Sequence, residues 1–400
     1  MLNCFNLYAI IWSVVLFLYD LGWSDYCSPL NIWLRIFIYA SIVVSIILGQ
    51  IFKLRMRYKK CIEQLNINNT GTIIICSLQM FEYIYCKKIP LIDTIFYKGD
   101  YTDFGGIPTL HLILYTFATF YSQYLFYGYL NEKKKRYLLN YIIILLVVFG
   151  LQFMRGGLTV CLSISAVMLL SSIQSKIRPK HIVISIVVVL IAVYLFGGFG
   201  NIRQGTSWND SSAFLRFGRI NNRFPTWLPK QFAWAYSYIV GSLGTLNYNV
   251  LRHNTASNIG FFIQSIIPDF IQRRLWPQTE LASGILLWRG FTTTTGYFSA
   301  YYYGGIVGLY VMYSILVIIA VYVTKSNRVK EKYRVIIIAN MGIIIGLFFF
   351  TNTISKSAIG FSIVYPIVFS LIRKKLIFTY GGIKIGKNQG IRLVKNLRGR

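Results

Sequence analysis

Acidic residues are scarce in this sequence: its 400 residues include 12 aspartates and glutamates against 41 lysines and arginines. Charged residues make up 13% of the chain and hydrophobic residues 55%, which leaves too little polar surface to cover a water-soluble globule. The mean hydropathy of +0.55 points the same way. We therefore expect most side chains to face lipid or other helices.

Histidine and cysteine are scarce too, at three and six residues. The cysteines form no C-x-x-C pair and lie mainly in or beside apolar runs, so neither a zinc site nor a disulfide framework is expected. We predict no metal site and no cofactor. The formal net charge of +29 is typical of cytoplasmic loops that contact anionic membrane lipids, and nucleic acid is not an expected partner.

Ten apolar runs are close to the roughly 17 to 25 residues that cross the hydrocarbon core of a bilayer. They lie at 5–22, 32–52, 71–86, 107–129, 137–153, 156–173, 181–199, 297–323, 335–353 and 357–372. Basic clusters fill every second connection between them, at 53–60, 133–136, 176–180 and 325–334. Because lysine and arginine collect on the cytoplasmic side, both termini are predicted to be cytoplasmic and the alternate connections external.

The predicted fold class is all-α, a polytopic integral membrane protein with about ten transmembrane helices and one long external loop carrying short helices. Its parts are an N-terminal membrane bundle of about seven spans at 1–199, the external loop at 200–296, about three spans at 297–372 and a basic cytoplasmic tail at 373–400.

The segment at 232–250 is nearly apolar enough to be an eleventh span. A single crossing there would move the basic cluster at 325–334 to the outside, which the charge rule disfavours. We therefore expect this segment to lie on, or dip into, the outer membrane face.

The predicted external loop is rich in arginine. It carries nine basic residues, eight of them arginine, against three acidic residues, a net charge of +6. External loops are usually poor in basic residues, and guanidinium groups bind phosphate and carboxylate oxygens bidentately. This bias favours an anion-binding site; the alternative is that the arginines only contact lipid headgroups. Arg155 and Lys356 reach the same face from two short connections.

Aromatic and hydroxyl side chains collect in the second half of the loop and at the start of the next span, among them Tyr236, Tyr238 and Tyr303. Such side chains suit a sugar-binding groove, and they also collect at membrane interfaces. Of the three histidines only His253 lies near the loop arginines, whereas His111 lies at the end of a predicted span. A lone histidine is more often packed or hydrated than catalytic.

Six short segments spread over most of the chain carry a family resemblance. They are KKIPLI at 87–92, FGGIPTLHLIL at 104–114, RGGL at 155–158, FGNIRQG at 199–205, YSYIVGSLGTLNYN at 236–249, and a TTTTG run before YYYGGIVG at 301–308. In kind and order they resemble segments of the Wzy-type oligosaccharide repeat-unit polymerases, the O-antigen or capsule polymerases of bacteria. The resemblance implies a multi-pass glycosyltransferase of the cell inner membrane that acts in lipopolysaccharide or capsular polysaccharide biosynthesis.

The resemblance also implies a substrate and roles for particular residues. The donor would be a growing glycan on undecaprenyl pyrophosphate, and the acceptor a single lipid-linked oligosaccharide repeat. Because charge develops on the leaving pyrophosphate, the site needs cationic clamps more than a metal. The implied catalytic residues are Arg155, Arg203 and Arg289 as the clamp, with His253 as the base. The implied substrate-binding residues are Arg219, Arg252, Arg273, Arg274, Tyr236, Tyr238 and Tyr303.

Membrane lipids and a chain-length regulator are the other partners that the resemblance implies, and two further functions stay open. An O-antigen ligase shares the many-span plan and the arginine-rich outer loop. A flippase or exporter of lipid-linked sugars would place charged residues inside the spans. Here the predicted spans contain only Asp20, Arg35 and Glu82 as exceptions, which favours chemistry at the membrane surface over transport.

Overall fold

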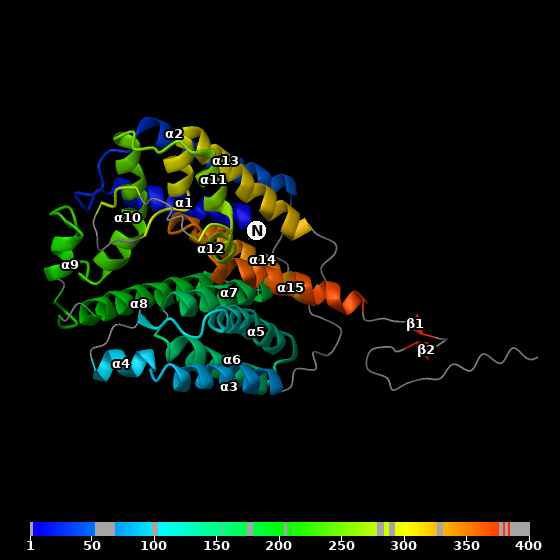
Figure 1. Ribbon diagram of the computed structural model, residues 1–400. Helices are drawn as coiled ribbons and strands as arrows, with labels where there is room; N and C mark the ends of the chain where they lie inside the picture. The colour runs from blue at the N-terminus through cyan, green and yellow to red at the C-terminus, as the bar shows by residue number, and fades with distance from the viewer. Residues whose placement is uncertain are drawn as a thin grey trace, which may run out of the picture.

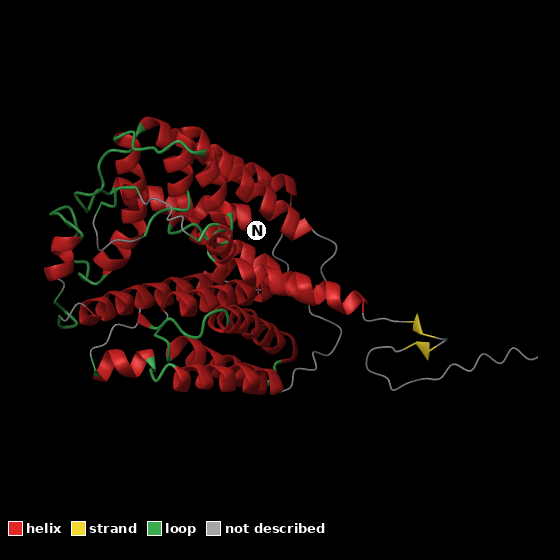
Figure 2. Cartoon of the chain, in the orientation of Figure 1, coloured by secondary structure: helices red, strands yellow, loops and turns green. Residues whose placement is uncertain are grey.

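The computed structural model describes residues 3–52, 69–97, 103–153, 155–173, 179–203, 206–210, 212–277, 284–287, 293–325, 331–375, 379–380 and 383–384. Their body is helical throughout (Figure 2). A single antiparallel pair of two-residue strands, β1 (Thr379–Tyr380) and β2 (Ile383–Lys384), lies outside that body in the described part of the tail. The all-α prediction is therefore confirmed.

A helix lies over each of the ten apolar runs, as far as the chain is described. These helices are α1 (Cys4–Asp20), α2 (Ile32–Phe52), α3 (Thr70–Tyr85), α5 (Leu110–Glu132), α6 (Lys135–Ile144) with its π-helical continuation η2 (Leu145–Gly150), α7 (Arg155–Ile173), α8 (Pro179–Arg203), α13 (Phe298–Lys325), α14 (Glu331–Gly346) with the 3₁₀ turn η4 (Leu347–Phe349), and α15 (Ser357–Lys375). Shorter helices are α4 (Pro90–Phe96), α9 (Ser212–Phe217), α11 (Ile259–Ile266) and α12 (Asp269–Leu275).

Two helices of the described chain, α2 and α13, are long and apolar enough to cross a membrane. Only 33% of the most apolar 18-residue window of each is buried in the protein, unlike the core helix of a soluble protein. Shorter apolar segments lie within α1, α7, α8 and α14. Length and composition thus identify two candidate spans, whereas the sequence predicts about ten.

Four helices form a closed bundle in which α5 packs on α7, α7 on α14, α14 on α15, and α15 back on α5. Inside it, Asn340 of α14 donates a hydrogen bond to Gln123 of α5 at 2.6 Å, and the rings of Phe120 and Phe369 stack with centroids 5.6 Å apart. Helices α3 and α6 pack on α5, so α3 to α6 lie together at the bottom of Figure 1.

Helix α1 joins this bundle to the rest of the molecule, because it packs on α14 as well as on α2 and α10. Its Tyr8 hydroxyl lies 2.7 Å from that of Tyr297 and 3.0 Å from Ser41 Oγ. These buried hydroxyls tie α1, α2 and the start of α13 together. Helices α2, α13, α11 and α10 form the upper part of the molecule in Figure 1.

Helix α10 (Phe232–Leu251) covers the segment that the sequence places on, or dipping into, the outer membrane face. Thirteen of its 20 residues are buried, and it packs against α1, α8 and α13. The structure shows that this segment is a helix packed among other helices of the protein, and its position relative to the membrane face stays a prediction. Its close fit to α8 needs glycine, because a Cβ on Gly197 would collide with the backbone of Gln231.

Candidate functional site

The candidate site lies at the end of the four-helix bundle where α5, α7 and α15 begin. The Thr116 hydroxyl of α5 lies 2.9 Å from the hydroxyl of Tyr365 in α15, which puts the N-terminal halves of these helices side by side. A Cβ on Gly157, in the first turn of α7, would overlap the Tyr115 hydroxyl of α5. Arg155 is the first residue of α7, so its backbone lies at this bundle end. Its side chain lies outside the described part of the structure.

Helix α12 is fixed to the same end by hydrogen bonds to the segment before α15. The backbone N–H of Asp269 donates to the Ser355 carbonyl at 2.8 Å, and the Asp269 carboxylate accepts from the N–H of Ser357 at 3.1 Å and from its hydroxyl. The N–H of Phe270 donates to the Ser357 hydroxyl at 3.2 Å. A carboxylate at the start of α15 also interacts favourably with the helix dipole.

The docked helix ends in Arg273 and Arg274, both of which are exposed. The Arg274 guanidinium lies 5.6 Å from the centroid of the Phe270 ring. Among the described residues, neither arginine forms an ion pair with an acidic side chain. Lys356, beside the docking segment, is exposed as well. Two guanidinium groups and an ammonium group thus belong to one rigid corner of the bundle end.

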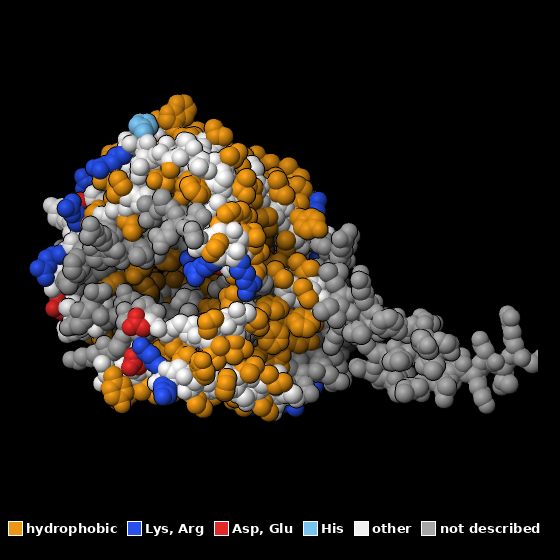
Figure 3. Space-filling model, viewed as in Figure 1, with side chains coloured by type: hydrophobic (Ala, Val, Ile, Leu, Met, Phe, Trp, Pro, Cys, Tyr) orange, Lys and Arg blue, Asp and Glu red, His pale blue; other side chains and the backbone are white. Residues whose placement is uncertain are grey.

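This face of the molecule is hollowed, as the space-filling view shows (Figure 3). The hollow lies between the regions that carry α12 and α4 in Figure 1. Lysine and arginine side chains border it on the α12 side, and both acidic and basic side chains lie on the α4 side. On the α4 side Lys88 pairs with Asp93 at 3.0 Å, so its charge is offset, whereas Arg273 and Arg274 have no acidic partner within the described ranges.

The end of α8 is organised around the buried amide of Asn201. Its Nδ2 donates to the Trp208 carbonyl at 2.9 Å, and its Oδ1 accepts from the Trp234 indole of α10 at 2.6 Å. These bonds fix the end of α8, of which Arg203 is the last residue. The Arg203 side chain lies outside the described residues, but its backbone is held where α8 meets α10.

Tyr238 lies at the junction of α8, α10 and the segment after η4. Its half-buried ring is 5.6 Å from that of Phe196, 6.2 Å from Trp234 and 6.0 Å from Phe350. Since Phe350 follows η4 at the bundle end, Tyr238 and the end of α8 belong to the same region as α12 and Arg155.

Arg219 and Tyr236 lie elsewhere, where the segment after α9 docks on the connection between α1 and α2. The Arg219 carbonyl accepts from the N–H of Asp25 at 3.0 Å, and its exposed guanidinium lies 5.5 Å from the Tyr26 ring centroid. The buried Tyr236 hydroxyl accepts from the N–H of Trp23 at 2.9 Å. Tyr236 therefore braces the structure.

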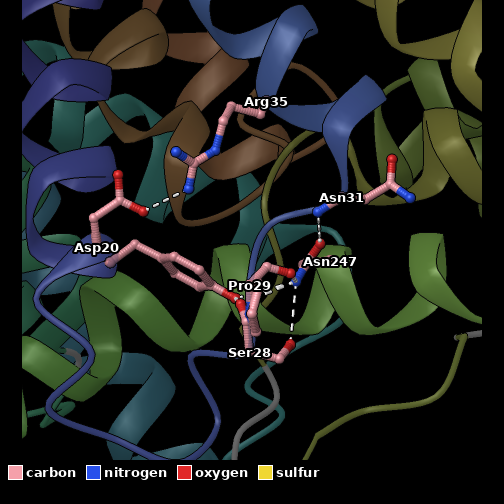
Figure 4. Close-up of polar contacts among 7 residues, drawn as sticks. Asp20, Ser28, Pro29, Asn31, Arg35 and Asn247 are labelled. Carbon is pink, nitrogen blue, oxygen red and sulfur yellow. Dashed lines mark hydrogen bonds and ion pairs between the residues drawn. The ribbon is translucent and has the colours of Figure 1, made fainter.

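Asn247 of α10 holds the same connection nearer to α2 (Figure 4). Its Nδ2 donates to the Pro29 carbonyl at 3.1 Å, the Ser28 hydroxyl at 3.2 Å and the Tyr19 hydroxyl at 3.2 Å, and its Oδ1 accepts from the N–H of Asn31 at 2.9 Å. The network anchors α10 to the connection between α1 and α2.

An ion pair closes the same corner between the two helices. The Arg35 guanidinium, in the first turn of α2, lies 2.9 Å from the Asp20 carboxylate at the end of α1 (Figure 4). Asp20 and Arg35, two of the three charged residues that the sequence places inside predicted spans, are therefore paired with each other at helix ends. A surface pair of this kind contributes little to stability.

Arg252, His253 and Tyr303 lie around the far end of α10 and the start of α13. The Arg252 guanidinium stacks 4.1 Å from the centroid of Tyr248, and His253 is exposed. Tyr303 is buried, with its carbonyl accepting from the N–H of Asn258 at 3.1 Å. The structure does not bring these residues to the bundle end, and Arg289 lies outside the described residues.

Glu82 of α3 and His111 of α5 form a pair that the sequence analysis does not predict. The Glu82 carboxylate, fully buried, is 2.9 Å from His111 Nδ1 at the first turn of α5. The residues are 29 positions apart, and no short motif links them. The apolar run around Glu82 was the one signal available, because an acid in such a run requires a partner.

In the described ranges, no three histidine, cysteine, aspartate or glutamate side chains gather as they would around a metal ion. Comparison with known proteins finds no match for this chain among protein-family models, curated proteins or solved structures. What the chain does must therefore be argued from its own residues.

Proposed function

We propose that this protein is a membrane-embedded glycosyltransferase that joins polyprenyl-pyrophosphate-linked oligosaccharide repeats into O-antigen or capsular polysaccharide at the outer face of the inner membrane. The observation that carries the proposal is the cationic corner at the bundle end, where Arg273 and Arg274 are exposed on a helix fixed by Asp269. Guanidinium groups held in place and unpaired with acids suit the oxygens of a pyrophosphate.

The membrane setting has support beyond α2 and α13. Helix α8 packs mainly on α10, and its apolar side chains from Ile186 to Ile191 are all exposed. Water would make such a surface costly, at about 25 cal/mol for each Å² of apolar area. A bilayer removes that cost, and ten helices crossing it would put the starts of α5, α7 and α15 on one side, together with the segment at 200–296.

The proposed reaction forms one bond and breaks one. A sugar hydroxyl of the acceptor repeat attacks the anomeric carbon of the donor glycan, the bond from that carbon to the pyrophosphate oxygen breaks, and the hydroxyl proton passes to a base. Negative charge develops on the departing pyrophosphate. Arg273 and Arg274 would stabilise that charge without rearranging. Arg155, at the start of α7, and Arg203, at the end of α8, would act with them.

Two other predicted residues fit supporting roles in this reaction. Tyr238 is half-buried beside Phe350, where an aromatic face could lie against a sugar ring. Tyr236 would act indirectly, by holding α10 to the connection between α1 and α2.

The proposal is tested in the host bacterium. The gene is deleted and restored as wild type, as the double variant Arg273→Ala/Arg274→Ala, and as Arg216→Ala, an exposed arginine of α9 at the edge of the molecule in Figure 1. Surface polysaccharide is then separated on a gel, with equal protein levels checked in the membrane fraction.

We expect single repeats in place of the ladder in the deletion strain and in the double variant, and a full ladder with wild type and Arg216→Ala. Long glycan that stays on its lipid carrier in the deletion strain would instead identify a ligase. Single repeats trapped on the cytoplasmic face would identify a flippase.

A further inference from the structure

We propose that His111 is the catalytic base that takes the proton from the acceptor hydroxyl, and that Glu82 is the residue that positions it. This inference rests on the proposed function and names the group that function leaves open. It replaces His253, the base implied by the family resemblance. The argument uses the geometry of the pair, its surroundings and its place in the bundle.

The Glu82 carboxylate is held by three donors. His111 Nδ1 lies 2.9 Å from Oε2, the backbone N–H of Ile107 donates to Oε1 at 2.9 Å, and the Gln79 amide donates to Oε2 at 3.1 Å. These hydrogen bonds satisfy the buried carboxylate and fix its orientation. Because Nδ1 faces the carboxylate, Nε2 is the ring nitrogen that would accept the proton of the acceptor hydroxyl.

The chain around the pair is shaped to enclose it. Gly106 has φ +62°, and a Cβ there would lie 2.6 Å from both Glu82 Oε1 and His111 Nδ1. Glycine alone among the common residues permits this backbone conformation at such close approach. The Phe104 ring meets the imidazole edge-on, with centroids 5.7 Å apart, and Tyr115 lies 6.4 Å away on its own helix. The ring is therefore fixed in orientation.

The imidazole connects the buried acid to the surface. The Glu82 side chain is 0% exposed and that of His111 is 19% exposed, so the ring covers the carboxylate while part of it reaches solvent. When the imidazole accepts a proton, the adjacent carboxylate stabilises the resulting cation without becoming protonated itself. This arrangement of acid, histidine and open edge is the one that general-base catalysis requires.

The pair also belongs to the bundle end. His111 lies in the first turn of α5, one turn before Tyr115, which contacts the first turn of α7 at Gly157. The neighbouring Thr116 reaches Tyr365 in the N-terminal half of α15, the helix to which α12 is docked. His253, by contrast, is exposed beyond the end of α10, and no described carboxylate pairs with it.

The test uses the purified full-length protein and lipid-linked single repeats extracted from the deletion strain. The variants are His111→Ala, His111→Gln, which keeps an amide donor for Glu82 but cannot act as a base, and Glu82→Gln, with His253→Ala as the matched control. Polymerisation rate and melting temperature are measured for each, and His111→Ala is measured again with added imidazole.

We expect His111→Gln to melt near the wild-type temperature and to polymerise roughly 100-fold or more slowly, the range that general bases contribute. Imidazole should restore part of the rate of His111→Ala. Glu82→Gln should lose about 10- to 100-fold with no imidazole rescue, and His253→Ala should stay within about twofold of wild type.

The base assignment is overturned if His111→Gln polymerises at the wild-type rate, or if a folded His111→Ala is inactive and imidazole restores nothing. A wild-type protein that leaves the single repeats unchanged overturns the proposed function as well. A slow His253→Ala beside an active His111→Gln would return the role to His253.

Discussion

The Asp269 carboxylate accepts a hydrogen bond from the backbone N–H of Ser357 at 3.1 Å, and so joins α12 to the first turn of α15. The two residues lie 88 positions apart in the sequence, and their contact holds α12 at the cationic corner. Because α12 has seven residues, too few for a stable isolated helix, its place depends on this contact. The orientation of Arg273 and Arg274 then depends on it too.

Replacing Asp269 by alanine should release α12 from the bundle. We expect the polymerisation rate to fall about tenfold or more, because misplaced charges stabilise the leaving group less well, and stability to fall by about 1–2 kcal/mol through the lost helix cap. Asp269→Asn keeps an oxygen acceptor, so its polymerisation rate and stability should lie between those of wild type and Asp269→Ala. Equal rates for alanine and wild type would show that α12 does not take part.

Gly305 should be essential to the bend in α13. It has φ 60° and ψ −154°, a region that only glycine adopts readily, so Gly305→Ala should cost about 1–3 kcal/mol of stability. The neighbouring Gly304→Ala is the control, because its Cβ would meet the Phe262 ring at an ordinary 3.4 Å. Melting temperatures of the two variants test this, and equal values would contradict it.

Asn247 should be a main anchor of α10. Removing its amide in Asn247→Ala leaves the N–H of Asn31 and the carbonyl of Pro29 without the partners seen in the structure, at a cost of about 1–3 kcal/mol. Asn222→Ala, at an exposed position, should change the melting temperature little. A stable Asn247→Ala protein would mean that the other contacts of α10 are enough to hold it.

Cys27, in the connection between α1 and α2, should react slowly with alkylating agents at neutral pH. Burial raises the pKa of its thiol from 9.0 to about 11, and only the thiolate reacts. The labelling rate, followed by mass spectrometry of the peptide that carries Cys27, should keep rising between pH 9 and 11. A plateau near pH 9 would contradict this.

The same shift in the Cys27 pKa affects stability. The folded value lies above the unfolded one, so the favourable contribution of the neutral thiol is fully present below about pH 9 and is lost as the pH rises through about 11. Part of any alkaline loss of stability should therefore disappear in Cys27→Ala.

Sequence alone predicts most of the long helices, because a helix in apolar surroundings requires an apolar run of matching length. It does not predict which helices α10 packs against, because the partners of Asn247 and Asn249 are far away along the chain. In the structure Asn249 bonds the Ile285 carbonyl at 2.8 Å, and Asn247 bonds the connection between α1 and α2. Partners so distant along the chain cannot be read from a window of residues.

The sequence predicts only part of the candidate site, because the contacts of its residues also involve partners far away along the chain. Composition identifies an arginine-rich segment, but not that Arg219 lies over Tyr26 or Arg252 over Tyr248 while Arg273 and Arg274 stay without an acidic partner among described residues. The Glu82–His111 pair forms only when α3 and α5 pack together. Tertiary contacts decide which charges remain available.

The central claim is polymerisation of lipid-linked repeats, and the most direct measurement is mass spectrometry of the products made by the purified protein in liposomes that hold extracted single repeats. We predict lipid-linked glycans at whole-number multiples of the repeat, formed with release of polyprenyl pyrophosphate and without added metal. Repeats that remain single, whether unchanged or moved across the bilayer, would contradict the account.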